Sequence, residues 1–142
     1  LGRYGDMSRA SFGPLAGVKF IELCHVMAGP TCGLMLADLG ADVIKVEKIN
    51  GGDDTRRNVP PDINGESTAY MMMNRNKRGI VVDLKTDGGR EVLMKLLADA
   101  DVVTENYRPG VMERLGLGYE NLKQINPGLI YAAISGFGRS GP

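Results

Sequence analysis

The sequence has no excess of charge of one sign and no long apolar run. Its 142 residues carry 17 lysines and arginines against 17 aspartates and glutamates. This balance argues against a general nucleic-acid binder or a polybasic membrane protein, although it leaves room for a local cationic site. No run approaches the roughly 18 apolar residues of a membrane span, and residues 1–13 lack the apolar core of a signal peptide. We therefore expect a soluble, cytoplasmic protein with neither a membrane nor a nucleic acid as its partner.

Cysteine and histidine are scarce, which limits the chemistry further. Cys24 and Cys32 lie eight residues apart, a spacing that matches neither a CxxC redox pair nor a zinc site. Free thiols, buried or half-buried, are therefore expected. His25 is the only histidine, so we expect no metal site. An imidazole with a pKa near ~6.5 could serve as a general base, but no nucleophile can be paired with it, so a structural or ligand-orienting role is favoured.

Glycine, in contrast, is plentiful. It contributes 20 of the 142 residues, about twice the usual ~7%. Because 43% of the residues are hydrophobic and 24% are charged, collagen, coiled coil and disorder all fit poorly. The glycines are therefore expected in turns and at close backbone approaches, in a chain long enough for one domain.

Short apolar segments alternate with segments of helical periodicity. Pro30 is placed to open the first helix, and Thr86 is placed to cap the second. Strands that are apolar on both faces and alternate with helices predict an α/β fold, a Rossmann-like, mainly parallel sheet with helices on both faces. Residues 50–70 have no clear periodicity and are expected to form an irregular surface loop. The predicted strands are 17–24, 41–47, 78–84, 101–105 and 129–135, and the predicted helices are 30–39, 90–98, 111–115 and 119–125.

The loop between the first strand and the first helix is one candidate ligand site. Open parallel sheets bind ligands beyond the carboxyl ends of their strands, and residues 25–31 lie there. Ala28 and Gly29 would let a ligand approach the backbone, and the N–H groups that open the helix suit a phosphate or a carboxylate. The segment is not GxGxxG, so a nicotinamide dinucleotide is not supported. A simple helix start remains the alternative.

Two further segments carry cations. Residues 74–78 place three cations directly before a buried strand, where they could neutralise phosphates. Residues 105–110, with Arg114 one helical turn later, combine an asparagine, an aromatic ring and two arginines that could bind a nucleotide. A solvated positive turn and a loop fixed by local hydrogen bonds remain the respective alternatives.

Taken together, the segments resemble the family III CoA-transferases, which have the α-methylacyl-CoA racemases as relatives. The resemblance covers almost everything from Pro14 to Pro142, in order and at the family's spacing. The matching stretches are PLAGVKFIEL, HVMAGPTCGLMLADLGADVIKVEKINGGDDTR, NRNKRGIVVDLKTDGGREVLMKLLADADVVTENYRPGVMERLGLGYENL and NPGLIYAAISGFGRSGP.

The resemblance implies the N-terminal portion of a larger enzyme that moves CoA between an acyl-CoA thioester and a carboxylic acid. The reaction would pass through an aspartyl-CoA intermediate, in an interlocked homodimer. Residues 1–13 would be a tail, and the composition of its start leads us to expect that Leu1 to Asp6 are a cloning remnant before Met7 as the natural start. Residues 14–142 would be a CoA-binding fragment that ends before the catalytic aspartate and is inactive alone. A racemase-like fragment and a non-catalytic CoA- or nucleotide-binding module remain alternatives.

The resemblance also implies where CoA would bind. The position of Met27 is often glutamine in formyl-CoA transferases, and methionine cannot donate an amide hydrogen bond. A dicarboxylate or another acyl acceptor is therefore favoured over formate. No catalytic residue and no metal ligand is expected in the chain. The implied CoA-binding residues are Val26, Met27 and Ala28 near the thioester end, Lys48 and Lys85 by the nucleotide, Asn106, Tyr107 and Arg108 along it, and Arg114 at a phosphate.

Overall fold

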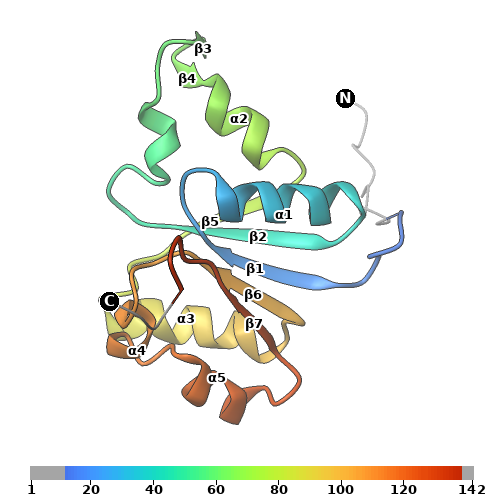
Figure 1. The fold of residues 1–142 in the computed structure, drawn as a ribbon, viewed down its shortest axis with the longest axis vertical. Coiled ribbons are helices and arrows are strands. Elements are labelled where there is room, and N and C mark those ends of the chain that lie inside the picture. The colour runs from blue at the N-terminus through green and yellow to red at the C-terminus, as the bar shows by residue number, and fades with distance from the viewer. Residues whose placement is uncertain (1–11, 139–142) are drawn as a thin grey trace, which may run out of the picture.

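Five strands form one parallel sheet in a computed structural model that describes residues 12–138 (Figure 1). The strand order is β5-β2-β1-β6-β7, and every neighbouring pair is parallel. The predicted N-terminal tail lies mostly outside the described residues. The strands are β1 (Lys19–Leu23), β2 (Asp42–Glu47), β5 (Arg78–Val81), β6 (Val102–Glu105) and β7 (Ile130–Ala133).

Helices cover both faces of this sheet. On one face α1 (Ala28–Asp38) packs on β1 and β2, and α2 (Thr68–Asn74) packs on α1. On the other face α3 (Asp87–Ala98) lies with α4 (Val111–Arg114) and α5 (Tyr119–Ile125) (Figure 1). The arrangement confirms the predicted Rossmann-like α/β layer. No helix among residues 12–138 is both long and apolar enough to cross a membrane.

The core follows the period-two alternation of the strands. Phe20 and Val43 are register partners and face α1, whereas Ile21 and Val46 belong to the larger cluster under α3, α4 and α5. Leu93 belongs to the same larger cluster and is fully buried in the apolar stripe of α3. The two clusters hold the sheet between its helical layers and fix which side chains emerge at the carboxyl ends of the strands.

The connections reverse direction at the centre of the sheet. The chain runs outward from β1 through β2 to β5, then crosses back to β6 beside β1 and continues to β7. Strands β1 and β6 are neighbours in the sheet, but the loop after β1 leads to a helix on one face and the loop after β6 leads to a helix on the other face. Such a switch point opens a crevice at the carboxyl ends of a parallel sheet.

Local capping explains where the structure departs from the predicted elements. The prediction of an irregular loop over 50–70 is wrong, because this segment forms regular elements. It contains the 3₁₀ helix η1 (Asp54–Arg57), the hairpin of β3 (Asp62–Ile63) and β4 (Glu66–Ser67), and the first turn of α2. Asp53 caps η1 by accepting from Thr55 N–H, and Ser67 caps α2. Helix α1 starts two residues before Pro30, and α3 begins directly after its cap, Thr86.

Candidate functional site

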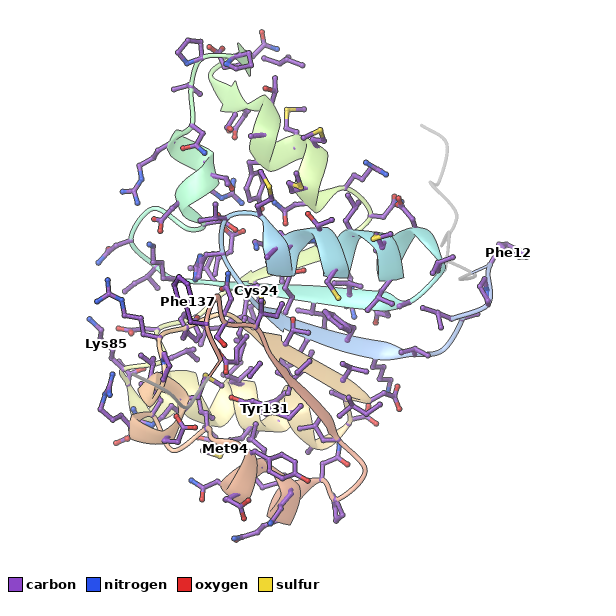
Figure 2. All side chains as sticks on the ribbon, in the orientation of Figure 1. Phe12, Cys24, Lys85, Met94, Tyr131 and Phe137 are labelled. Atoms are coloured by element: carbon purple, nitrogen blue, oxygen red, sulfur yellow. The ribbon has the colours of Figure 1, made fainter. Side chains whose placement is uncertain are left out.

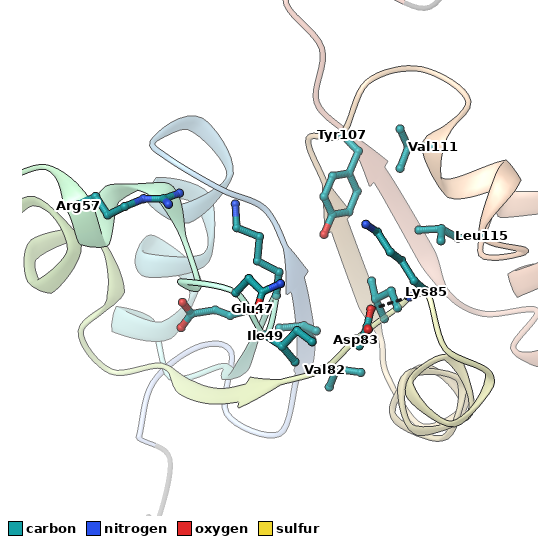
Figure 3. Close-up of a pocket in the computed structure, with 13 residues that line it drawn as sticks. Glu47, Ile49, Arg57, Val82, Asp83, Lys85, Tyr107, Val111 and Leu115 are labelled. Atoms are coloured by element: carbon teal, nitrogen blue, oxygen red, sulfur yellow. Dashed lines mark hydrogen bonds between the residues drawn. The ribbon is translucent and has the colours of Figure 1, made fainter.

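A pocket of about 540 Å³ opens at the carboxyl ends of β2, β5 and β6 (Figure 3). Its volume lies within the range of small-molecule sites. The loop after β2, the loop after β5, the loop after β6 and helix α4 form its walls. The lining residues are Val46, Glu47, Lys48, Ile49, Asn50, Arg57, Val82, Asp83, Leu84, Lys85, Tyr107, Val111 and Leu115.

Three cations line this pocket. Lys48 and Arg57 share the exposed carboxylate of Asp54, at 2.7 Å and 2.5 Å respectively. Within residues 12–138, no carboxylate lies at salt-bridge distance from the ammonium group of Lys85, whose backbone N–H donates to Asp83. The carboxylates of Glu47 and Asp83 also line the pocket, and Glu47 is bound by Arg56. The ammonium group of Lys85 is thus the pocket's cation best placed to meet an anionic ligand.

Tyr107 supplies an aromatic wall of the pocket, beside Val111 and Leu115 (Figure 3). Figure 3 shows its ring and the Lys85 side chain directed toward one another across the pocket. Burial, and to a smaller degree Cys24 and Glu105, raises the pKa of Tyr107 to about 12. The phenol is therefore neutral at ordinary pH, and its half-buried ring lies 5.8 Å from the His25 ring, measured between centroids.

The structure brings only part of the predicted CoA set into this pocket. Lys48, Lys85 and Tyr107 line it, whereas the exposed Arg108 and Arg114 do not. The Arg114 guanidinium lies near Gly110, where it would be 3.1 Å from an added Cβ. Arg114 is therefore beside the first turn of α4, at the outer margin of the loop that carries Tyr107.

The predicted CoA-binding residues near the thioester end lie in the turn after β1. Val26, Met27 and Ala28 are exposed there, with 46% of Val26 and 62% of Met27 accessible. Val26 has a φ of 70°, in the left-handed region that β-branched residues avoid. Asn106, in contrast, is occupied: its side chain accepts from His25 N–H at 2.9 Å and donates to the His25 carbonyl at 2.8 Å.

Gly29 has a packing role. An added Cβ would lie 2.2 Å from both Cβ and Sγ of Cys24, so the absence of a side chain lets α1 rest on the end of β1. The prediction that Gly29 opens the backbone to a ligand is therefore wrong. Cys24 is buried (Figure 2) and its thiol donates to Thr104 at 3.4 Å. Burial is the main reason why the pKa of Cys24 rises to about 12, as expected of an inert structural thiol.

A cluster of buried charges lies beneath the turn, between the sheet and α1. Lys45 is 1% exposed and bridges Glu22 at 2.9 Å and Asp53 at 2.8 Å, while Lys77 binds the other oxygen of Glu22 at 2.8 Å. Gly33 of α1 leaves the space for this, because its added Cβ would lie 1.9 Å from Glu22 Oε2. Two carboxylates and two ammonium groups make the cluster neutral, which buried charges require.

The pKa shifts follow from this pairing. Burial alone would raise the pKa of Asp53, but the Lys45 ammonium and the Thr55 N–H and hydroxyl hold it at about 2. Burial lowers the pKa of Lys45, yet Glu22 and Asp53 outweigh burial and raise it above the ordinary value. Burial likewise lowers the pKa of His25, so its imidazole is neutral at neutral pH.

A second ion pair joins the end of β2 to the segment after it. Arg56 binds both oxygens of Glu47 at 2.8 Å, and Tyr70 of α2 donates to the same carboxylate at 2.8 Å. Despite burial, these bonds and the Asp53 N–H lower the pKa of Glu47 to about 2. Segment 53–70 is thereby fixed to the sheet, and with it the Arg57 wall of the pocket.

The predicted phosphate site at residues 74–78 is wrong, because its three cations are each paired with a carboxylate. Arg75 binds Asp38, Lys77 binds Glu22 and Arg78 binds Asp42. None of the three lines the pocket. Among residues 12–138, no three histidine, cysteine or carboxylate side chains are grouped so that they could hold a metal ion.

Sequence reasoning missed Arg57 in the pocket and the charges in the strands. The strands are not apolar on both faces, since Glu22 and Lys45 are register partners on the α1 face. The sequence did contain a signal for these buried charges. Glu22 and Lys45 each follow by two positions an apolar residue that faces α1, so period-two alternation places them on the same buried face. Asp53 and Arg57 belong to segment 50–70, where the lack of periodicity hid both the cap and the cation.

A parallel sheet with a central switch point and helices on both faces is a Rossmann-like layer, and its cationic pocket lies at the edge where such layers hold ligands. Comparison with known proteins identifies which kind of layer it is. The model of CoA-transferase family III matches residues 15–142, and the chain belongs to this family.

Several relatives are similar over nearly the whole chain. A succinyl-CoA:glutarate CoA-transferase from Homo sapiens is 48% identical over 129 residues, 91% of this chain and 30% of the relative. A succinate–glutarate CoA-transferase from Agrobacterium fabrum is 50% identical over 135 residues, 91% of this chain and 34% of the relative. The crystal structure of a CAIB/BAIF family protein from Brucella suis matches with a TM-score of 0.87 at 50% identity, over 92% of this chain and 35% of that chain. The chain thus spans about a third of the length of these relatives.

Proposed function

We propose that the pocket beside β2, β5 and β6 binds the nucleotide and phosphate part of CoA. The observation that carries the proposal is the group of three cations, Lys48, Arg57 and Lys85, around an aromatic wall at the carboxyl edge of a family III layer. Ammonium and guanidinium groups bind phosphate through charge-assisted hydrogen bonds, and the Tyr107 ring offers a face for the adenine base. The exposed Arg114 extends the positive surface beyond the pocket.

We propose further that the whole protein moves CoA between an acyl-CoA thioester and a carboxylic acid. An aspartate would attack the thioester carbon and release CoA as a thiolate, leaving a mixed anhydride. The thiolate would then attack the aspartyl carbonyl of this anhydride, which forms an aspartyl-CoA thioester and releases the donor acid as a carboxylate. The acceptor carboxylate would attack the aspartyl thioester, giving a second mixed anhydride and releasing the CoA thiolate. Attack of this thiolate on the acceptor's carbonyl would form the new acyl-CoA and free the aspartate. The names of the similar relatives support transfer over racemisation.

The nucleophilic aspartate is proposed to lie outside residues 12–138. Each buried carboxylate in that range already accepts hydrogen bonds or pairs with a cation, which lowers its nucleophilicity. Asp53 and Glu22 are bound by lysines, Glu47 is bound by Arg56, and Glu105 accepts from Tyr107 N–H and the Tyr131 hydroxyl. The described layer would therefore bind and orient CoA, and the reacting carboxylate would be brought to it.

Calorimetric titration with CoA tests the proposed binding site. Lys85→Ala should weaken binding by about 1 to 3 kcal/mol, roughly 5- to 150-fold in Kd, because it removes a charge-assisted contact with phosphate. Arg114→Ala should act in the same direction. Lys95→Ala is the matched control, since Lys95 is exposed and pairs with Glu91 away from the pocket. Unchanged affinity in Lys85→Ala would remove this pocket from the CoA site, and equal affinity for NADH would remove CoA as its ligand.

The acceptor can be identified by assaying the whole protein with succinyl-CoA and a series of carboxylic acids. Met27 cannot donate the amide hydrogen bond that glutamine would supply, so we propose a dicarboxylate rather than formate as acceptor. Rapid turnover with formate, at a rate equal to that with glutarate, would contradict this. We also propose that the whole protein is a homodimer, which light scattering during size-exclusion chromatography measures directly.

A further inference from the structure

Four consecutive backbone groups in the turn after β1 are bound by side chains from distant segments. Lys45 donates to the Cys24 carbonyl at 2.8 Å, and the Asn106 side chain binds both the N–H and the carbonyl of His25. Asp53 accepts from the Val26 N–H at 3.1 Å. A turn on a protein surface ordinarily leaves such groups to water. Here each one has a fixed partner within the protein.

These bonds hold a conformation that the turn would not adopt alone. Val26 has a φ of 70°, and a β-branched residue in the left-handed region carries a steric penalty. Such residues persist where the surrounding structure over-determines them, and they concentrate at ligand-binding sites. The Val26 side chain is itself 46% exposed, so packing of that side chain does not account for the strain.

The three tethering residues are themselves firmly held. Asp53 is fully buried and also accepts from the N–H and hydroxyl of Thr55, at 2.9 Å and 2.8 Å. Lys45 is fixed between Asp53 and Glu22 within the neutral charge cluster. Asn106 follows β6, on the other side of the switch point, so its two bonds join the loops that leave the sheet in opposite directions.

We propose that Asp53, Lys45 and Asn106 are positioning residues that hold the turn at Cys24–Val26 in the shape that meets the thioester end of bound acyl-CoA. The inference rests on the proposed function, together with the expectation from the family resemblance that the exposed Val26 and Met27 face that end of the ligand. It assigns Asn106 a role through the turn rather than through direct contact with CoA, because both ends of its amide are engaged by His25. A turn fixed before the ligand arrives avoids the entropic cost of ordering it on binding.

Asn106→Ala in the whole protein tests the inference, with Asn126→Ala as the matched control. Asn126 makes the same kind of tether, donating to the carbonyls of Leu97 and Ala100 at 3.1 Å and 2.7 Å, away from the turn. Asn106→Ala should lower kcat/KM for acyl-CoA by about 10- to 100-fold, as expected when reacting groups are misplaced. The loss should fall mainly on kcat, because the nucleotide contacts that set ground-state binding remain. Asn126→Ala should keep both constants at the level of the unmodified protein.

Amide hydrogen exchange provides a readout that does not depend on activity. Asn106→Ala should accelerate exchange at His25 and also at Val26, because the two amides share one tethered turn, and Asn126→Ala should accelerate neither. Asp53→Asn keeps the size of the side chain but removes its charge toward Lys45, so it should accelerate exchange at Val26 and lower kcat in the same direction. If Asn106 simply contacted CoA, Asp53→Asn would leave kcat unchanged, which would overturn the inference.

The outcomes separate this inference from the function on which it rests. If the unmodified protein transfers no CoA and binds none, the proposed function fails and the positioning role fails with it. If the unmodified protein transfers CoA while Asn106→Ala and Asn126→Ala show the same kinetics, the positioning role alone fails. Lower kcat together with faster exchange at His25 and Val26 supports the inference.

Discussion

Replacing Lys45 with methionine should destabilise the protein far more than the loss of an exposed lysine. The side chain is 1% exposed and its ammonium group lies between the carboxylates of Glu22 and Asp53. Methionine fills a similar volume, so the change removes charge and hydrogen bonds rather than packing. Glu22 keeps its second partner, Lys77, at 2.8 Å, whereas Asp53 loses the one cation that it binds among the residues that the structure describes.

The magnitude follows from the ionisation of Asp53. Its pKa is about 2 in the folded protein against an ordinary value of 3.8, a difference that corresponds to about 2 kcal/mol of stability when the carboxylate is ionised. Lys45 and Thr55 both contribute to this difference, so Lys45→Met removes part of it and in addition leaves the buried charge of Asp53 without a cation. The Cys24 carbonyl also loses its donor, at a cost of about 1 kcal/mol. We therefore expect Lys45→Met to lower the free energy of unfolding by about 3 kcal/mol, within the range for breaking a buried ion pair.

The effect should depend on pH in a defined direction. In the unmodified protein the folded pKa of Asp53 is depressed, so its contribution is complete above about pH 4 and is lost as the pH falls toward about 2. In Lys45→Met, burial without the cation raises the pKa of Asp53, and protonation then relieves the uncompensated charge. The difference in stability between the two proteins should therefore shrink from about pH 7 to about pH 4.

Urea unfolding followed by circular dichroism measures these differences. Lys95→Met is the control, because Lys95 is exposed and its pair with Glu91 is worth less than about 0.5 kcal/mol. A loss below about 1 kcal/mol for Lys45→Met at neutral pH, or a difference that grows as the pH falls, would refute the interpretation of the buried cluster.

Two further predictions concern the junction of α1 with β1. Gly29→Ala should cost about 1–3 kcal/mol in thermal or urea unfolding, because its Cβ would overlap Cys24. Gly88 is a helical glycine whose added Cβ would meet no side chain, and no backbone beyond its own stretch of helix, within 4 Å, so Gly88→Ala should be neutral or stabilising by up to about 1 kcal/mol. Similar losses for both variants would contradict the close approach. Cys24 should resist alkylation until the protein unfolds, because it is buried and its pKa is raised to about 12. Labelling of Cys24 in the folded protein as fast as the half-buried Cys32 would show that the junction opens.

Local sequence signals were sufficient for the layer and for part of the site. The apolar strands, the Thr86 cap and the apolar stripe of α3 depend on neighbours within a few positions, so the α/β order could be predicted. Lys48 and Lys85, which the resemblance implies lie by the nucleotide, both line the pocket at the carboxyl ends of the strands, and their contact with CoA stays a prediction. The positions of Val26 and Met27 relative to CoA remain predictions.

The remaining features depend on register and on distant partners. Whether Asn106 is free to meet a ligand depends on His25, which follows another strand, and Asn106 resembles any polar loop residue when its neighbours in sequence are considered alone. The buried position of Asp53 likewise depends on its ion pair with Lys45. Asp53 lies in segment 50–70, whose sequence has no periodic pattern that would predict this contact. Sequence spacing does not fix such contacts, since they form only after the strands are aligned.

The central place of β1 has a consequence for the order in which the chain assembles during synthesis. Phe20 of β1 pairs with Val43 of β2, which is made soon afterwards, and with Val102 of β6, which is made only after many more residues. The half of the sheet formed by β5, β2 and β1, together with α1 and the neutral charge cluster, is complete in sequence once Lys77 and β5 have been made.

Until β6 emerges, the other edge of β1 has no partner strand within this half of the sheet. An open edge with apolar residues beside it is a template for pairing, either with β6 of the same chain or with a strand of another chain. The same central position that places the switch point next to the turn after β1 therefore makes the nascent chain dependent on a strand that is synthesised late.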